Sequence, residues 1–276
     1  MNVMNKIELQ PVGVFDSGVG GLSLLKCMRE ELQGENFIYV ADSGYAPYGD
    51  KPTEYIEKRS FAITDFLVEQ NAKAIVVACN TATAAAIAKM RSTYDIPIIG
   101  MEPGVKPAIS TTQCGTVGIM ATAETLKSEK FRLLTDRFCN ECNIVTQPCP
   151  GLVEQVEQFD IEGEKTRELL KIYVEGLLSK GADTIVLGCT HYLFLVDLIR
   201  EIAGDDIKVI DTGTAVAKEV HRRLETSGIM ADPESKGKEI FRTSGNIDNA
   251  QKVIEKLWGN CVTVKPLPDR FMNNAL

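Results

Sequence analysis

An apolar segment that stops at a cysteine and continues with hydrogen-bonding residues occurs twice in this chain. The first copy is Ala74–Ala84, with the sequence AIVVACNTATA, and the second is Thr184–Tyr192, with the sequence TIVLGCTHY. Apolar residues recur three and four positions apart in the segments before them, Arg59–Lys73 and Glu164–Lys180, which predicts a helix in each case. The chain therefore repeats a unit of amphipathic helix, buried strand and cysteine.

The two cysteines, Cys79 and Cys189, are predicted to lie at the carboxyl ends of parallel strands. Ligands of open α/β sheets bind in the crevice at these strand ends. A free cysteine on its own is commonly a buried packing residue. Two cysteines at equivalent ends of a repeated unit, each followed by side chains that form hydrogen bonds, instead favour a functional role. The side chains that follow them are Asn80, Thr81, Thr190 and His191.

Two other predicted strands also end in segments suited to function. Val12–Phe15 leads into Asp16, Ser17 and a glycine-rich turn, after which a helix is predicted. Glycines let the backbone approach a ligand closely, but the spacing G-x-G-G differs from that of a dinucleotide-binding loop. Asp16 or Ser17 could also simply cap the following helix. Phe37–Ala41 leads into a loop, 42–52, that is rich in Gly, Pro, Asp and Ser.

The second half of the chain starts again with a predicted strand, 115–121. Thr122 and Thr125 follow this strand where Asp16 and Ser17 follow the first. Because domains typically contain about 100–200 residues, the repeat in a chain of 276 residues predicts two α/β domains. Further strands are predicted at 208–210, 239–244 and 262–264, and a closing helix is predicted at 248–258.

The composition, with 44% hydrophobic and 25% charged residues, is that of a globular protein. The net charge of −8 opposes attraction to phosphate backbones and anionic membranes, so we expect no direct nucleic-acid partner and no membrane partner. The sequence has no recognisable signal peptide and no run of about 18 apolar residues. We therefore expect a cytoplasmic protein whose eight cysteines are reduced. Cys139 and Cys142 have the spacing of half a zinc site, but no second pair completes it, so we expect no metal.

Two thiols that approach one carbon atom from opposite faces can invert its configuration. One removes a proton as a thiolate, and the other returns a proton as a thiol. Because a free thiol has a pKa of about 8.5, a neighbouring group has to favour the thiolate. Asp16 is a candidate partner for one thiol and His191 for the other, and Asp16 also suits the ammonium group of an amino acid. Neutral donors suit the carboxylates of such a substrate, and the candidates are Ser17, Asn80, Thr81, Thr122 and Thr190.

Four motifs together resemble the cofactor-independent aspartate/glutamate racemase family. They are Val14–Gly21 (VFDSGVGG), Pro47–Gly49 (PYG), Val77–Ala82 (VACNTA) and Leu187–Tyr192 (LGCTHY), in the family's order across nearly the whole chain. The resemblance implies reversible interconversion of L- and D-glutamate, which supplies D-glutamate for peptidoglycan, without pyridoxal phosphate, any other cofactor or a metal.

The resemblance also implies the fold: two pseudo-symmetric, Rossmann-like α/β domains with mostly parallel sheets and the active site in the cleft between them. The expected first domain is discontinuous, comprising 1–102 and 211–276, because the C-terminal segment returns to complete it. The expected second domain is 103–210.

Carried over to this chain, the resemblance implies that Cys79 is the thiol that acts on D-glutamate and that Cys189 is the thiol that acts on L-glutamate. Asp16 and His191 assist them, and the spacing after Cys149 favours Glu157 over Glu154 as a further catalytic residue. Ala121 stands where the family pattern has glycine, so the backbone there is expected to differ. The expected substrate contacts are Asp16, Ser17, Pro47, Tyr48, Gly49, Asn80, Thr81, Thr122, Thr125, Thr190 and His191.

We expect a homodimer, although no sequence feature specifies one. We also expect no need for a cell-wall precursor as activator, since only about a dozen residues precede the first strand motif. Three alternatives stay open: a racemase for aspartate, a cysteine hydrolase, and a two-domain binding protein. The hydrolase would use Cys189 as nucleophile and His191 as base, which leaves Cys79 without a role. The binding protein would hold glutamate without exchanging its α-hydrogen.

Overall fold

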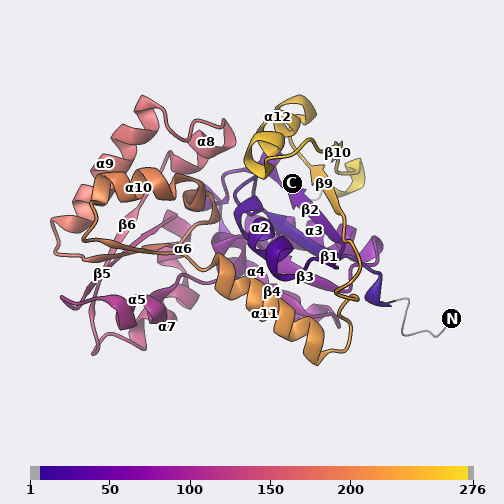
Figure 1. Ribbon diagram of the computed structural model, residues 1–276, viewed down its shortest axis with the longest axis horizontal. Helices are drawn as coiled ribbons and strands as arrows, with labels where there is room; N and C mark the ends of the chain where they lie inside the picture. The colour runs from indigo at the N-terminus through magenta and orange to yellow at the C-terminus, as the bar shows by residue number, and fades with distance from the viewer. Residues whose placement is uncertain (1–6, 273–276) are drawn as a thin grey trace.

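The computed structural model describes residues 7–272, which form two parallel sheets lying side by side as two lobes (Figure 1). The larger sheet has six strands in the order β10-β9-β2-β1-β3-β4. Its strands are β1 (Val12–Asp16), β2 (Phe37–Ala41), β3 (Ala74–Val77), β4 (Ile98–Gly100), β9 (Glu239–Thr243) and β10 (Val264–Pro266).

The smaller sheet has four strands in the order β6-β5-β7-β8. They are β5 (Thr116–Ala121), β6 (Asn143–Pro148), β7 (Thr184–Leu187) and β8 (Lys208–Ile210). Every strand pairing within the described part of the chain is parallel, which agrees with the predicted α/β class. The apolar runs are the inner strands, because a parallel sheet is covered by helices on both faces.

Helices cover both faces of each sheet. In the six-stranded half they are α2 (Leu22–Glu31), α3 (Thr53–Glu69), α4 (Asn80–Thr93), α11 (Gly213–Thr226) and α12 (Ile247–Trp258). In the four-stranded half they are α5 (Val105–Thr111), α6 (Ala123–Lys127), α7 (Glu129–Asp136), α8 (Leu152–Glu157), α9 (Glu164–Leu178) and α10 (Val196–Ala203). Short 3-10 turns are η1 (Ser43–Tyr45), η2 (Tyr48–Asp50), η3 (Thr190–Leu195) and η4 (Asp269–Phe271).

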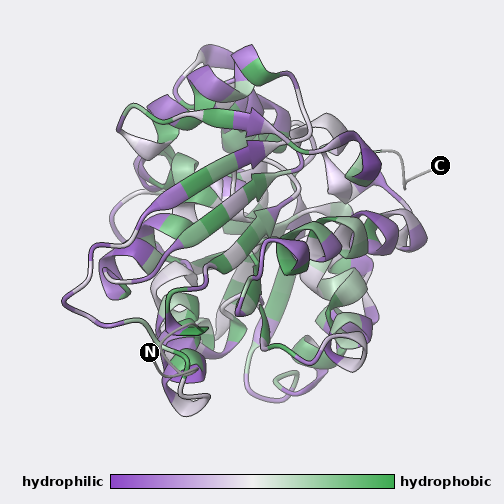
Figure 2. Ribbon diagram, turned by 90° about the vertical axis from the view of Figure 1, so that its right-hand side faces the viewer, coloured by the Kyte–Doolittle hydropathy of each residue, from purple (hydrophilic) through white to green (hydrophobic). Residues whose placement is uncertain are grey.

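Alternate residues of β1 show how the layers form. Val12 and Val14 pack with residues of α2, α11 and α12, whereas Phe15 packs with residues of α3 and α4 on the opposite face. Figure 2 shows hydrophobic residues concentrated on the strands and on the helix faces turned toward them. Within residues 7–272, no helix is both long and apolar enough to cross a membrane.

The two sheets share one strand order. The order β2-β1-β3-β4 in the larger sheet corresponds to the order β6-β5-β7-β8 in the smaller one. In each set the strand that comes first in the sequence, β1 or β5, occupies the second place in the sheet. In such a sheet the chain leaves the central strand to one side and then returns to the other, which opens a crevice between β1 and β3 and between β5 and β7. The repeat found in the sequence is therefore a repeat of topology, and both cysteine motifs follow strands that border such a crevice.

The C-terminal segment returns to the six-stranded sheet, where β9 pairs with β2 and β10 forms the edge. The strand expected at 262–264 is displaced toward the C-terminus, to Val264–Pro266. The chain passes between the two sheets after β4 and again after β8. The domain bounds stated above stay a prediction.

Candidate active site

The cysteines of the two repeated motifs occupy equivalent positions. Cys79 directly precedes α4 and has φ −140° and ψ 122°, while Cys189 directly precedes η3 and has φ −146° and ψ 134°. The side chains are almost fully buried, with 5% and 7% of their surfaces exposed. The same local sequence pattern has therefore produced the same strand end twice.

Cys79 lies in a cluster with residues of the turn after β1. Its sulfur accepts a hydrogen bond from the backbone N–H of Ala82 at 3.4 Å and lies 3.7 Å from Oγ of Ser17. Burial raises the pKa of the Cys79 thiol, and the charges of Asp16 and Cys189 raise it further. This shift favours the thiol over the thiolate, and the thiol is the form that can donate a proton.

Cys189 lies beside a histidine that is itself held by a carboxylate. Its sulfur is 3.8 Å from Nδ1 of His191, whose Nε2 is 2.7 Å from Oε1 of Glu157. Burial alone would lower the pKa of His191, but hydrogen bonds to Cys189 and Glu157, together with the charge of Asp16, raise it well above its ordinary value. The shift favours the charged imidazolium form of His191 beside the sulfur.

Asp16 joins the two halves of this cluster. Its fully buried carboxylate accepts hydrogen bonds from the N–H of Gly21 at 2.7 Å, from Ser17 Oγ at 3.3 Å and from Thr190 Oγ1 at 3.4 Å. Nδ1 of His191 lies 3.8 Å away. Burial raises the pKa of Asp16, and the charge of His191 and the bond from Gly21 offset only part of that rise.

The structure places Glu157, rather than Glu154, against His191. The Glu157 carboxylate also accepts the N–H of Val19 at 2.6 Å and the hydroxyl of Ser43 at 2.7 Å, and both donors belong to the six-stranded half. Gly151, with φ 87°, forms the left-handed turn from which α8 carries Glu157 into this position. Both Glu154 and Glu157 line a neighbouring cavity, but of the two only Glu157 is hydrogen-bonded to His191 within residues 7–272.

The glycine-rich turn after β1 permits this close approach. A β-carbon on Gly18 would lie 1.9 Å from Oε1 of Glu157, and one on Gly20 would lie 2.2 Å from Nδ1 of His191. The turn therefore needs glycines because side chains of the other half occupy the space. The glycine spacing, G-x-G-G, is not that of a dinucleotide-binding loop.

Three threonines, two of them from the four-stranded half, form one cluster of hydroxyls, the threonine wall. Oγ1 of Thr81 is 2.9 Å from Oγ1 of Thr122 and 3.1 Å from Oγ1 of Thr125. A β-carbon on Gly49 would lie 2.8 Å from Cβ of Thr122, so the loop after β2 touches this wall. The amide of Asn80 is buried, and neither of its polar atoms has a hydrogen-bond partner within residues 7–272. These groups are available as neutral donors and acceptors for a ligand.

The Tyr48 hydroxyl is hydrogen-bonded to a buried carboxylate of the same loop. The hydroxyl donates to Oδ2 of Asp42 at 2.5 Å, and burial together with the charge of Asp42 raises the pKa of the phenol well above its ordinary value. Pro47 lines a cavity of about 240 Å³ whose wall also includes Ser43 and Glu157. The loop thus approaches the other half through Gly49, while Tyr48 is buried in the same hydrophobic cluster as Cys79.

Sequence reasoning missed Asp42, Ser43 and Arg59. Ser43 and Asp42 belong to a loop that was recognised only as polar, and nothing local distinguishes the residues that turn inward. A signal for Arg59 did exist, because it lies three positions from Ile56 and four from Ile63 on the buried face of α3. A lone arginine on an apolar helix face indicates a buried partner.

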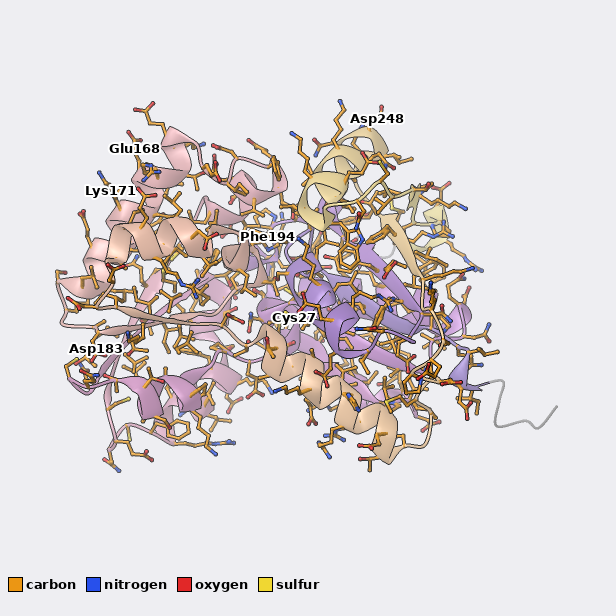
Figure 3. The ribbon with its side chains drawn as sticks, viewed as in Figure 1. Cys27, Glu168, Lys171, Asp183, Phe194 and Asp248 are labelled. Carbon is orange, nitrogen blue, oxygen red and sulfur yellow. The ribbon has the colours of Figure 1, made fainter. Side chains whose placement is uncertain are left out.

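Three other thiols differ in burial and position. Cys27, on α2, is partly buried where α2 meets α11, and Figure 3 shows it near the middle of the molecule. Cys139, which was considered as a zinc ligand, is exposed, and Cys142 is partly buried.

Two α/β halves that bring a thiol each to one buried cluster, with a carboxylate and a histidine beside them, define an enzyme of the acid–base type. Residues 12–220 match the Asp/Glu/Hydantoin racemase family, and the chain belongs to that family. The family resemblance predicted from the four motifs is confirmed.

Known relatives match over nearly the full length of the chain. The glutamate racemase of Methylococcus capsulatus is 51% identical over 261 residues, which is 95% of this chain and 96% of that protein. The glutamate racemase of Pseudomonas aeruginosa is 47% identical over 262 residues, covering 95% of this chain and 98% of that one.

Solved structures confirm the fold. A glutamate racemase isoform from Bacillus anthracis superposes with a TM-score of 0.86 at 31% identity, covering 94% of this chain and 97% of its own. The Francisella tularensis glutamate racemase in complex with D-glutamate gives a TM-score of 0.82 at 27% identity, covering 95% and 98%. The predicted fold of two α/β units is therefore shown.

Proposed function

We propose that this protein interconverts L- and D-glutamate by moving a proton to and from the α-carbon, with Cys79 and Cys189 on opposite faces of the substrate. The equivalent placement of the two thiols at corresponding strand ends carries this proposal. The naming of its relatives as glutamate racemases, at up to about half identity over nearly the whole chain, supports the choice of substrate.

In the proposed reaction one thiol removes a proton and the other returns one. From L-glutamate, the Cys189 thiolate takes the α-proton, and the electron pair of the broken C–H bond stays on the substrate as a carbanion. The Cys79 thiol then donates its proton to the opposite face, which gives D-glutamate, a Cys79 thiolate and a Cys189 thiol. From D-glutamate the same steps run in reverse.

The surrounding groups support both proton transfers. The His191 imidazolium, held by Glu157, stabilises the Cys189 thiolate, while Asp16 stands beside Cys79 and suits the substrate ammonium group. Asn80 and the threonines 81, 122 and 125 supply neutral donors for carboxylates. Ser17, Thr190 and the Pro47-Tyr48-Gly49 segment complete the proposed substrate contacts.

Isotope exchange tests the proposal directly. The purified protein is incubated with each glutamate enantiomer in D2O, with optical rotation and the α-hydrogen NMR signal followed together. We expect both enantiomers to reach the same racemic end point with deuterium at the α-carbon. Cys79→Ser and Cys189→Ser should each abolish racemisation, whereas Cys27→Ser, at a thiol outside the cluster, should not.

The same experiment separates the alternatives. Exchange of aspartate but not glutamate would preserve the mechanism and replace the substrate. Activity that survives Cys79→Ser would contradict a two-thiol mechanism, and binding of glutamate without exchange would show a binding protein.

We also propose a cellular setting. The protein acts in the cytoplasm as a homodimer and supplies D-glutamate for peptidoglycan. Within each protomer, the first domain comprises 1–102 and 211–276, and the second comprises 103–210. Light scattering on the purified protein tests the dimer. Rescue of a bacterial strain that depends on external D-glutamate tests the supply role.

A further inference from the structure

A fully buried ion pair lies behind the loop that follows β2. Asp42 is the first residue after that strand, and Arg59 comes from α3; neither side chain has any exposed surface. The guanidinium meets the carboxylate in two places, with Nη2 2.8 Å from Oδ1 and Nε 3.0 Å from Oδ2. This two-point contact fixes the orientation of both groups as well as their separation.

The pair connects segments that are far apart in the chain. Asp42 also accepts the hydroxyl of Tyr48, and its backbone N–H donates to the carbonyl of Asp16 at 3.0 Å. Nη1 of Arg59 donates to the carbonyl of Phe271 at 2.7 Å. The guanidinium carbon lies 3.8 Å from the centre of the Tyr45 ring. The candidate site, the loop after β2, α3 and the C-terminal turn therefore meet at one ion pair.

A buried ion pair is a poor source of stability, because removing two charges from water costs about as much as their attraction returns. Its distinctive property is geometric, since a carboxylate with several charged and neutral donors permits only one arrangement of the groups around it. Here the arrangement includes the loop whose Gly49 contacts Thr122 of the other half so closely that a β-carbon would lie 2.8 Å from Cβ of Thr122.

We propose that Asp42 and Arg59 are positioning residues that hold the Tyr48-Gly49 segment against the threonine wall and beside Asp16. This inference rests on the proposed function, because it gives that segment the task of binding glutamate. Tyr48 then serves as a tether through its hydroxyl and contacts substrate only through its backbone and ring face.

The chain contains a matched control for this pair. Lys73 and Glu35 form a second buried ion pair, with Nζ 2.6 Å from Oε2 and side-chain exposures of 1% and 2%. Glu35 precedes β2 and Lys73 precedes β3, whereas Asp42 follows β2, so the control pair lies at the opposite end of the same sheet. Asp42→Asn and Glu35→Gln each remove one charge with little change of shape.

We expect both variants to lower the melting temperature, but only Asp42→Asn to affect the site. In that variant the KM for glutamate should rise by roughly tenfold, the loss typical of one charged hydrogen bond, with kcat changed by less than about threefold. Hydrogen exchange of the amides in 43–50 should become faster in Asp42→Asn and stay unchanged in Glu35→Gln. Tyr48→Phe removes only the hydrogen bond from the Tyr48 hydroxyl to Asp42. This variant should show smaller increases in KM and in the exchange rates of 43–50, and it tests the proposal if Asp42→Asn does not fold.

Two results would overturn the inference: equal effects of Asp42→Asn and Glu35→Gln on KM and on exchange, or unchanged KM and exchange in both Asp42→Asn and Tyr48→Phe. The wild-type protein keeps this test separate from the proposed function. If the wild type does not racemise glutamate, the proposed function is wrong, and the exchange rates of 43–50 still decide whether the pair holds the loop.

Discussion

Replacing Gly20 by alanine tests whether the position of His191 matters for activity. The added β-carbon would lie 2.2 Å from Nδ1 and 2.6 Å from Cε1 and Cγ of that ring. Because ordinary contacts begin at 3.4 Å, the imidazole must move by about 1 Å. It cannot move freely, since it is 1% exposed and its Nε2 is held by Glu157 at 2.7 Å.

Both stability and rate should respond. Overpacking of a buried site costs about 1–3 kcal/mol, which a folded domain tolerates. A displacement of about 1 Å in a catalytic group lowers the rate by roughly 100-fold. Because L- and D-glutamate have equal free energies in water, kcat/KM must fall by the same factor in both directions.

The measurement is kcat/KM for each enantiomer by circular dichroism, together with the melting temperature. Gly176→Ala in α9 is the control, because its β-carbon would meet only the end of the Gln147 side chain, at 3.2 Å. That variant should keep wild-type activity. A folded Gly20→Ala protein with wild-type kcat/KM would refute the assigned role of His191.

Three further predictions concern single side chains. Glu157→Gln removes an interaction that raises the pKa of His191, so the imidazolium is lost at lower pH and the alkaline fall in kcat should move to lower pH. An unchanged pH profile would argue against this pairing. Asp183, shown in Figure 3 at the outer end of the four-stranded sheet, accepts the N–H groups of Gln113 and Cys114 at 2.7 and 2.8 Å, and the hydrogen bonds it accepts outweigh its slight burial and lower its pKa. A carboxylate whose pKa is lower in the folded state stabilises the fold fully at pH values above its unfolded-state pKa of about 3.9. This stabilisation is lost as the pH falls through the folded-state pKa. Asp183→Asn should therefore reduce stability at pH 7 by about 1 kcal/mol in urea titrations, and by progressively less below about pH 4; an equal loss at pH 2 would contradict this. Thr122→Val keeps the shape of the threonine wall but removes a hydroxyl, so the KM for glutamate should rise roughly tenfold. The melting temperature should also fall, because Oγ1 of Thr122 caps α6 by accepting the N–H of Thr125 at 3.2 Å; an unaltered KM in the folded variant would remove Thr122 from the substrate contacts.

The strands, their parallel arrangement and the two cysteine motifs were predictable from the sequence, because each depends on local pattern. A buried parallel strand must be an apolar run, and the first polar residue after it marks the strand end. Cys79 and Cys189 could therefore be placed at equivalent strand ends before any contact was known. The family followed from the same motifs.

Only the tertiary structure decided which polar side chains meet. Glu154 and Glu157 lie about one turn apart on the same short helix, and the spacing after Cys149 favoured Glu157 without showing which groups it meets. Contacts with Val19 and Ser43, more than a hundred residues away, hold Glu157 beside His191. The partner of Arg59 was likewise invisible, because the helix pattern shows that the arginine is buried but not which loop carboxylate it meets. Local sequence determines what each segment becomes, whereas the meeting of two strand ends depends on how both halves pack against one another.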